Sequence, residues 1–409
     1  MPESPGPRRR EVLLGLGGAA LAAVLAACGA DQRPAPSSAT PSRTPSATPS
    51  ASPAPEPTPT PTVADVDVEV MVGQMILLGF RGTTLTPDAP VVADLRDRHI
   101  GSLLIAAHDV PSGRPLRNIA SPAQLAALSA AVQETAGRPV LLATDEEGGA
   151  VARLGPEFGF PATRSAADLG AAGDVDATRA AGAAIARTLR DAGIRLNLAP
   201  VVDVDTNPSN PVIGALGRSY SADPAVVAAQ AGAFVAGHRD TGVLTCLKHF
   251  PGHGSSTSDS HAGFVDVSST WQPLELDPYR SLIGAGLADA VMAAHVFNDR
   301  IDPTYPASLS SATITDLLRG ELGFGGVVIS DDLQMGAITQ GWGLTDAIRL
   351  SVLAGTDILT FSNNLDTYDP DLGRTVHTTL LDLVRSGVVS EDRIAESYAR
   401  ITALTARVA

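Results

Sequence analysis

At residues 244–254 the chain reads LTCLKHFPGHG, an apolar run that passes directly into the reactive side chains of Lys248, His249 and His253. A short continuous apolar run suits a strand that is covered on both faces, as in a parallel sheet. Runs of this kind recur through the chain. The candidate strands are residues 72–80, 102–106, 140–143, 196–202, 244–247, 290–294, 327–329 and 358–360.

Segments with helical periodicity lie between these runs. The first opens with Ser121-Pro122, and Pro is favoured in the first turn of a helix. Strands that alternate with helices predict a parallel sheet, and eight such units fit a TIM-type (β/α)8 barrel. A doubly wound open sheet is the competing arrangement. The expected helices are residues 121–135, 176–192, 224–239, 274–287 and 313–322.

Chemically capable side chains stand where the predicted strands end. In a barrel, the carboxyl ends of the parallel strands converge on one face, where active sites form. A single polar strand end is ordinarily a helix cap or a turn, but several in register indicate a shared site. The polar stretches are residues 144–149, 203–205, 248–254, 295–298 and 330–332.

The composition limits the class of protein. The chain has 409 residues, of which 44% are hydrophobic, and a formal net charge of −15. That apolar content can bury a large core and excludes wholesale disorder. The acidic balance argues against a nucleic-acid partner, which requires a basic face. Two cysteines are too few for a disulfide framework or a Cys-rich zinc site, and no phosphate-loop lysine motif is present, so neither a metal nor a nucleotide cofactor is expected.

The N-terminal segment has the pattern of an export signal. Three arginines at 8–10 precede an apolar run at 12–27, which is shorter than the roughly 20 residues of a spanning helix. The run ends in Leu25-Ala26-Ala27-Cys28, which resembles the lipobox of bacterial lipoproteins and predicts lipidation of Cys28. An ordinary secretory signal with an incidental cysteine is the alternative, and Arg9-Arg10 loosely resembles a twin-arginine signal.

The expected domain organisation has three parts. Residues 1–27 are the signal peptide, 28–64 a solvated tether and 65–409 one catalytic domain. Residues 33–62 contain ten Pro, six Ser, six Thr and five Ala, a composition that favours an extended, semi-rigid chain and permits O-glycosylation.

Two stretches carry a family resemblance. Residues 248–254 read KHFPGHG and residues 259–261 read DSH. This pair resembles the signature of bacterial β-N-acetylhexosaminidases of glycoside hydrolase family 3, in particular the members with one catalytic domain. Other motifs match that family in order: DEEGG at 145–149 followed by Arg153, NLAPVVDV at 197–204, GRSY at 217–220 and SD at 330–331. Departures from its pattern are Glu146, Ala150 and Ser255.

The resemblance implies a retaining hydrolysis with an unusual acid. It makes Asp331 the nucleophile, which forms a covalent glycosyl ester and later releases it. Successive strand side chains face opposite ways, so Asp332 is a chemically equal candidate and only the motif selects Asp331. His261, on a mobile loop, is implied to protonate the leaving oxygen and then to activate water, and the ordinary pKa of histidine near 6.5 suits both steps. Asp259 would hold the other ring nitrogen.

The same loop contains three glycines and a serine. Gly252, Gly254 and Gly263 are expected to let the loop swing over bound sugar. Ser260, which lies between Asp259 and His261, is expected to matter little.

The resemblance also implies a set of sugar-binding residues. Carboxylates accept paired sugar hydroxyls, and cationic donors fix orientation. The implied binding residues are Asp145, Arg153, Arg218, Lys248 and His249. Weaker candidates are Asp203, Asp205, His295 and Asn298, and Asp203 suits a buried structural acid equally well.

Two patterns are read as structural. His249 and His253 have the spacing of helical zinc ligands, but Pro251 and Gly252 break any helix there, so no metal site is predicted. Cys246 lies in an apolar strand and is expected to be a small core residue.

The sequence therefore predicts a lipid-anchored enzyme of the cell envelope, on the outer face of the cytoplasmic membrane. Its expected activity is that of an exo-β-N-acetylglucosaminidase, which removes terminal GlcNAc from peptidoglycan fragments. The alternatives are a related family 3 β-glucosidase, a glycoside phosphorylase, and a sugar-binding lipoprotein without catalysis.

Overall fold

The computed structural model describes residues 66–408. Eight parallel strands close into a barrel, in which β1 pairs with both β2 and β12. Closure confirms the predicted (β/α)8 barrel and excludes the open sheet. The barrel strands are β1 (Ile76–Gly79), β2 (Ser102–Leu104), β3 (Leu141–Thr144), β6 (Leu196–Asn197), β7 (Leu244–Phe250), β9 (Ala290–Ala293), β11 (Val327–Asp332) and β12 (Ile358–Phe361).

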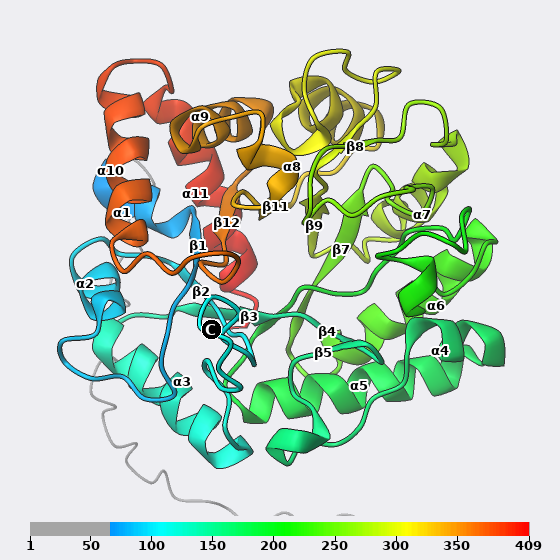
Figure 1. Cartoon of the computed structure of the whole chain (residues 1–409), viewed down its shortest axis with the longest axis horizontal. Coiled ribbons are helices and arrows are strands. Elements are labelled where there is room, and N and C mark those ends of the chain that lie inside the picture. Colours follow the sequence, from blue (N-terminus) through cyan, green and yellow to red (C-terminus); the bar gives the residue numbers. More distant parts are fainter. Residues whose placement is uncertain (1–65, 409) are drawn as a thin grey trace, which may run out of the picture. The chain divides into compact units, whose positions relative to one another are not determined.

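Helices surround the barrel (Figure 1). Each strand is followed by at least one helix before the next strand begins, and after β9 this helix is the π-helix η6 (Ala312–Glu321). The α-helices are α1 (Val68–Gln74), α2 (Pro90–Arg96), α3 (Pro122–Ala136), α4 (Ala166–Ala172), α5 (Val175–Asp191), α6 (Pro224–Arg239), α7 (Asp277–Gly284), α8 (Gly336–Thr339), α9 (Leu344–Ala354), α10 (Leu372–Arg385) and α11 (Glu391–Thr405).

The ends of helix α3 follow directly from its sequence. The Ser121 hydroxyl accepts a hydrogen bond from the Gln124 main-chain nitrogen at 3.2 Å, and the Gln124 side chain reaches back to the main-chain nitrogen of Ser121. This capping box satisfies amide groups that have no partner inside the helix. Gly137 ends the helix in a left-handed conformation, which favours glycine.

The apolar runs form the barrel wall. Every residue of β1, β2, β3, β7, β9 and β12 is buried, as expected for strands covered on both faces. Cys246 is one of these buried residues, as predicted.

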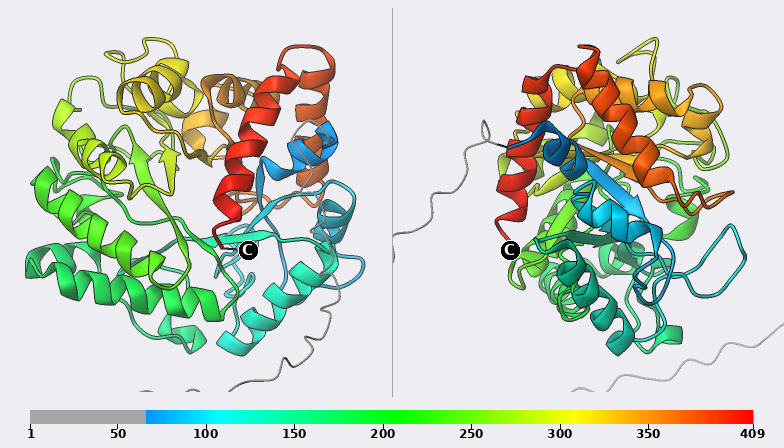
Figure 2. Two further views of the ribbon diagram at one scale, coloured as in Figure 1. Left: turned by 180° about the vertical axis from the view of Figure 1, so that it is seen from behind. Right: turned by 90° about the vertical axis from the view of Figure 1, so that its left-hand side faces the viewer.

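Helix α11 runs across the N-terminal ends of the strands (Figure 2, left). Arg400 bonds to Asp357 just before β12 at 3.1 Å, and Arg407 bonds to Asp289 just before β9 at 2.6 Å. Helix α1 packs against α10 and α11. These contacts place α11 at the N-terminal ends of β9 and β12, away from the C-terminal strand ends.

The two largest departures from the predicted strands are at residues 72–80 and 196–202. Residues 72–80 contain the end of helix α1 as well as β1, because Asp67 caps a helix there and the apolar run is buried in either conformation. In the run 196–202 only Leu196–Asn197 is strand. Pro200, after a cis peptide bond, has no N–H for the ladder. Conversely, β7 and β11 extend beyond their predicted ends and include Lys248, His249 and Asp331.

Between residues 66 and 408, two short strand pairs and four 3-10 turns lie in the loops. The pairs are β4 (Glu146–Gly148) with β5 (Val151–Ala152) and β8 (Val265–Asp266) with β10 (Val296–Phe297). The 3-10 turns are η2 (Pro156–Phe158), η3 (Gly214–Leu216), η4 (Pro273–Leu276) and η5 (Ala307–Leu309).

The N-terminal predictions lie outside the described residues. These are the signal peptide at 1–27, lipidation at Cys28 and the tether at 28–64. Within residues 66–408, no helix has both the length and the apolar character needed to cross a bilayer.

Candidate active site

A cavity of about 470 Å³ opens at the C-terminal ends of the barrel strands. Strand β3 leads into Asp145, β7 carries Lys248 and His249, and β11 carries Asp331. The fold thus brings together residues far apart in the chain, as the barrel geometry predicts. All eight residues proposed from the sequence line this cavity: Asp145, Arg153, Arg218, Lys248, His249, Asp259, His261 and Asp331.

Lys248, the chain's only lysine, is the centre of a buried charge cluster. Its Nζ lies 2.6 Å from Asp145 Oδ1 and 2.8 Å from Glu147 Oε1. The Arg218 guanidinium donates two hydrogen bonds of 2.7 Å to the Glu147 carboxylate. Burial opposes charge on Glu147, but Lys248 and Arg218 hold the pKa of its carboxyl well below the ordinary range. Glu147 therefore stays ionised between its two cations, and the cluster presents fixed donors and acceptors to the cavity.

Glu147 is a structural member of the site that was not predicted as a site residue from the sequence. Its carboxylate joins Lys248 of β7 to Arg218, which follows η3. The sequence feature that could have indicated Glu147 is its position two residues after Asp145, in the same polar stretch at a strand end. The preceding Glu146 faces elsewhere: its Oε2 accepts hydrogen bonds from the main-chain nitrogens of Arg153 and Leu154, at 2.7 and 2.8 Å, and so positions Arg153. The Arg153 guanidinium lies 4.0 Å from Asp145.

Asp203 orients His249 from below the cavity. His249 Nδ1 donates to Asp203 Oδ2 at 2.7 Å, while Asp203 Oδ1 accepts from the main-chain nitrogens of His249 and His253. Burial opposes its charge, yet His249 lowers the pKa of Asp203 below the ordinary value. Arg218 Nη2, which can only donate, lies 3.3 Å from His249 Nε2. Asp203 is therefore both a buried structural acid and the residue that fixes the His249 tautomer.

The environments of Asp331 and Asp332 differ sharply. Burial alone would raise the pKa of Asp331, but the facing histidines His295, His249 and His261 lower it to about 2. Asp332 has no such partners, and burial raises its pKa to about 6. Its carboxylate is occupied in accepting from Ser362 and from the Gln334 main chain. The geometry favours Asp331 as the ionised carboxylate available to a substrate.

Asp259 and His261 form a hydrogen-bonded pair at the rim of the cavity. His261 Nδ1 donates to Asp259 Oδ1 at 2.8 Å, and the same oxygen accepts from the His261 main-chain nitrogen at 2.8 Å. The His261 side chain is 58% exposed. The bond to Asp259 sets which ring nitrogen is protonated and leaves Nε2 open to the cavity.

Two other histidines near Asp331 use both ring nitrogens in hydrogen bonds, and burial keeps a third neutral. His249 uses both ring nitrogens, as described above. His295 Nε2 donates to the Asp332 carbonyl at 2.8 Å, and its Nδ1 accepts from the Ser308 hydroxyl at 2.7 Å. Burial, reinforced by His249, lowers the pKa of His253 to about 4. These rings support the site, and they leave His261 as the exposed histidine with a carboxylate partner.

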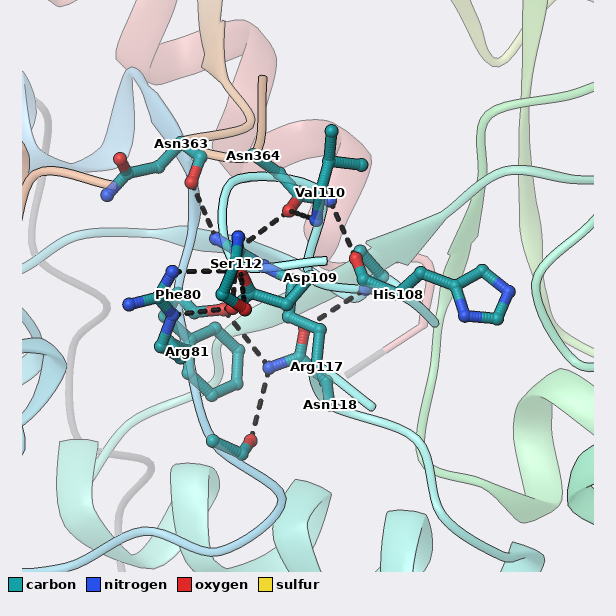
Figure 3. Close-up of polar contacts among 12 residues, drawn as sticks. Phe80, Arg81, His108, Asp109, Val110, Ser112, Arg117, Asn118, Asn363 and Asn364 are labelled. Atoms are coloured by element: carbon teal, nitrogen blue, oxygen red, sulfur yellow. Dashed lines mark hydrogen bonds and ion pairs between the residues drawn. The ribbon is translucent and has the colours of Figure 1, made fainter. Parts of the chain in front are cut away.

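One side of the rim is tied together by a buried arginine (Figure 3). Arg117 donates to the Asn363 carbonyl at 2.8 Å and to Asn364 Oδ1 at 2.9 Å, and it pairs with Asp109, which also binds Arg81. This network holds the loop after β2 against the end of β12. His108, whose ring extends away from the network, lines the cavity. No motif in the sequence indicated this rim.

The remaining candidates lie away from the cavity. Asp205 and Asn298 do not line it, and Asn298 Oδ1 caps the main-chain nitrogen of Arg300.

His249 and His253 lie in a strand and the turn that follows it, so they do not have helical ligand geometry. Among residues 66–408, no group of three or more His, Cys, Asp or Glu side chains is arranged to hold a metal ion.

The chain resembles known proteins over this whole region. The family model of the glycosyl hydrolase family 3 N terminal domain matches residues 67–404. A β-hexosaminidase of Xylella fastidiosa (strain M23) is 38% identical over 331 residues, which cover 78% of this chain and 93% of the relative. A β-hexosaminidase of Stenotrophomonas maltophilia (strain K279a) is 37% identical over 339 residues, with the same coverage.

Solved structures agree with this. A family 3 β-N-acetylglucosaminidase from Paenibacillus sp. str. FPU-7 superposes with a TM-score of 0.76 at 37% identity, covering 84% of this chain and 62% of that one. A β-N-acetylhexosaminidase from Beutenbergia cavernae DSM 12333 has a TM-score of 0.73 at 32% identity, covering 83% of this chain and 98% of that one.

Proposed function

The chain belongs to glycosyl hydrolase family 3 and is a glycoside hydrolase of the β-N-acetylhexosaminidase type, and from that premise we propose that it is a retaining exo-β-N-acetylglucosaminidase. Its proposed substrates are peptidoglycan fragments with a terminal β-linked GlcNAc. One observation carries the mechanism: the ionised Asp331 and the exposed Asp259–His261 pair line the same cavity.

In the first step Asp331 attacks the anomeric carbon. The bond to the leaving oxygen breaks, and a glycosyl ester to the carboxylate forms. The doubly protonated His261 ring donates its Nε2 proton to the leaving oxygen, and Asp259 stabilises the imidazolium through Nδ1.

In the second step the same groups act in reverse. Neutral His261 now has a lone pair on Nε2 and accepts a proton from water. The resulting hydroxide character lets the water oxygen attack the anomeric carbon, which releases Asp331 as a carboxylate. Two displacements at one carbon give overall retention of configuration.

The buried cluster around Lys248 holds the sugar during both steps. Asp145 is partly exposed and offers acceptor oxygens to paired hydroxyls, while Lys248, Arg218 and Arg153 supply donors. Glu147 and Asp145 together balance the charges of Arg218 and Lys248, so the cluster orients the sugar as a fixed set of paired charges.

The first test is the substrate preference of the purified protein. We expect kcat/KM for an aryl β-GlcNAc glycoside to exceed that for the matching β-glucoside by at least about 100-fold, because a site built to bind a polar group rejects an analogue that lacks it. The products are analysed with and without phosphate. Equal rates on both glycosides would indicate a glucosidase, phosphorolysis would indicate a phosphorylase, and no turnover would indicate a binding protein.

We further propose that the enzyme is anchored on the outer face of the cytoplasmic membrane through lipidated Cys28. Several acyl chains anchor a protein stably, whereas one does so only marginally. The proline-rich tether would let the barrel reach wall fragments while remaining attached.

The anchor is tested by substituting Cys28→Ala. We expect the variant to leave the membrane fraction while kcat and KM stay at wild-type values. Continued membrane association would contradict the lipoprotein assignment.

A further inference from the structure

The acid/base segment 259–263 lies against helix α8, which begins four residues after Asp332. Three hydrogen bonds join the two segments. The main-chain nitrogen of Gly336 donates to the His261 carbonyl at 3.2 Å, and that of Ala337 donates to the Ser260 carbonyl at 3.1 Å. The Gln340 side-chain amide donates to the Ala262 carbonyl at 2.9 Å.

The two main-chain bonds provide acceptors for amide groups at the start of helix α8. The first amide groups of any helix have no intrahelical acceptor. At α8 the residue before the helix is Met335, whose side chain provides no cap. The carbonyls of Ser260 and His261 instead accept the hydrogen bonds of these amide groups. The segment that carries the acid/base residue is therefore the N-terminal cap of the helix that follows the nucleophile strand β11.

Gly336 permits this close approach. A Cβ atom at position 336 would lie 2.8 Å from the His261 carbonyl oxygen and 2.9 Å from the Ala262 carbonyl carbon. Real Cβ atoms do not come this near to main-chain atoms, so any larger residue at 336 would push the segment away.

A second anchor lies on the inner side of the segment. Ser260 is 3% exposed, although Ser258 and His261 on either side of it are exposed. The Ser260 hydroxyl lies 3.3 Å from His253 Nε2, and the His253 main-chain nitrogen is bound by Asp203 at 2.8 Å. We expected Ser260 to matter little, but its burial and its partner argue otherwise.

We propose that helix α8 and His253 dock the acid/base segment, with Gly336 and Ser260 as positioning residues. Docking fixes His261 relative to Asp331, because helix α8 follows strand β11, which carries Asp331, and also binds the segment that carries His261. The inference rests on the proposed acid/base role of His261.

Two matched pairs of variants test it. Gly336→Ala introduces the clashing Cβ, whereas Gly341→Ala adds one whose nearest atom is 3.9 Å away. Ser260→Ala removes the buried hydroxyl, whereas Ser258→Ala removes an exposed one. Alanine is a better helix former than glycine, so Gly336→Ala should keep its Tm.

For Gly336→Ala and Ser260→Ala we expect kcat/KM on a substrate with a poor leaving group to fall about 10- to 100-fold, part of what a general acid contributes. On an activated aryl glycoside the fall should be less than about threefold, since little protonation is needed. Amide hydrogen exchange at Gly336 and Ala337 should quicken in the same two variants. Gly341→Ala and Ser258→Ala should match wild type in each measurement.

The outcomes separate this inference from the proposed function. If His261→Ala shows the leaving-group dependence but Gly336→Ala and Ser260→Ala behave as wild type, the docking inference is wrong and the acid/base assignment stands. If His261→Ala slows all substrates equally, the assignment itself is wrong. Unchanged amide exchange in both Gly336→Ala and Ser260→Ala would overturn docking in either case.

Discussion

In an Asp331→Asn protein we expect hydrolysis of β-GlcNAc glycosides to fall by about four orders of magnitude or more, because no glycosyl ester can form. The carboxylate accepts one hydrogen bond, from the Asp332 main-chain nitrogen at 2.8 Å, and an amide oxygen can accept it as well. Folding should therefore be retained, and thermal unfolding should show a Tm close to that of wild type. Steady-state rates on an activated aryl glycoside measure the loss.

The neighbouring residue supplies the control. Asp332→Asn keeps an acceptor for the Gln334 and Ser362 main-chain nitrogens, and its amide can still bond to the Ser362 hydroxyl. We expect a much smaller loss, because this carboxyl, with its pKa raised to about 6, supports the strand end and has no acid/base partner.

A trapped intermediate discriminates further. A slowly released substrate analogue should label Asp331. In an Asp331→Ala protein, added azide should restore turnover and give the glycosyl azide of inverted configuration, because it attacks from the face that the carboxylate has left. A label on Asp332, or near-wild-type rates in a folded Asp331→Asn protein, would refute the nucleophile assignment.

The barrel was predictable because its strands are local features. Each is a short apolar run between helical segments, and such runs need no knowledge of distant contacts. The errors arose where that pattern is ambiguous. The run at 72–80 is buried both as helix and as strand, so periodicity alone did not separate the end of α1 from β1. In the run at 196–202, Pro200 was the visible warning, since it cannot extend a ladder.

The site was predictable only as a set of strand ends. Its hydrogen bonds and ion pairs join residues that are distant in sequence, such as Glu147 and Arg218, which lie 71 positions apart. No local pattern indicates that Glu147 bridges Arg218 and Lys248 or that Arg117 holds the rim through Asn363 and Asn364.

The loop glycines show the same limit. The expected role of Gly252 and Gly254 in loop mobility stays a prediction, and the structure adds a packing role, because Cβ atoms there would meet Glu275 at 2.7 Å and the Val204 carbonyl at 1.7 Å. In this structure they allow close packing at the base of the segment, which was not visible in the sequence.

The second large effect concerns the acid. We expect His261→Ala to lower kcat/KM by about 10² to 10⁴ for substrates whose leaving group needs protonation, such as disaccharides. For a dinitrophenyl glycoside the fall should be less than about tenfold, because that phenolate departs without help. Since kcat/KM reports the step that forms the ester, the comparison isolates the acid role from the later base role.

The geometry predicts two companions to this result. Asp259→Ala should show the same dependence on leaving group in weaker form, because it removes only the group that orients His261 Nδ1. His108→Ala is the matched control. His108 is also an exposed histidine that lines the cavity, but its Nδ1 donates to the Pro115 carbonyl at 2.9 Å and not to a carboxylate.

The slope of log kcat/KM against leaving-group pKa is therefore the decisive quantity. It should steepen in His261→Ala and Asp259→Ala and keep its wild-type value in His108→Ala. A steeper slope in His108→Ala alone would assign the acid role to His108. Equal slowing at every leaving-group pKa in His261→Ala would mean that the ring binds substrate. The exposed Asp259–His261 pair would then orient the sugar, and proton transfer would belong to another group in the cavity.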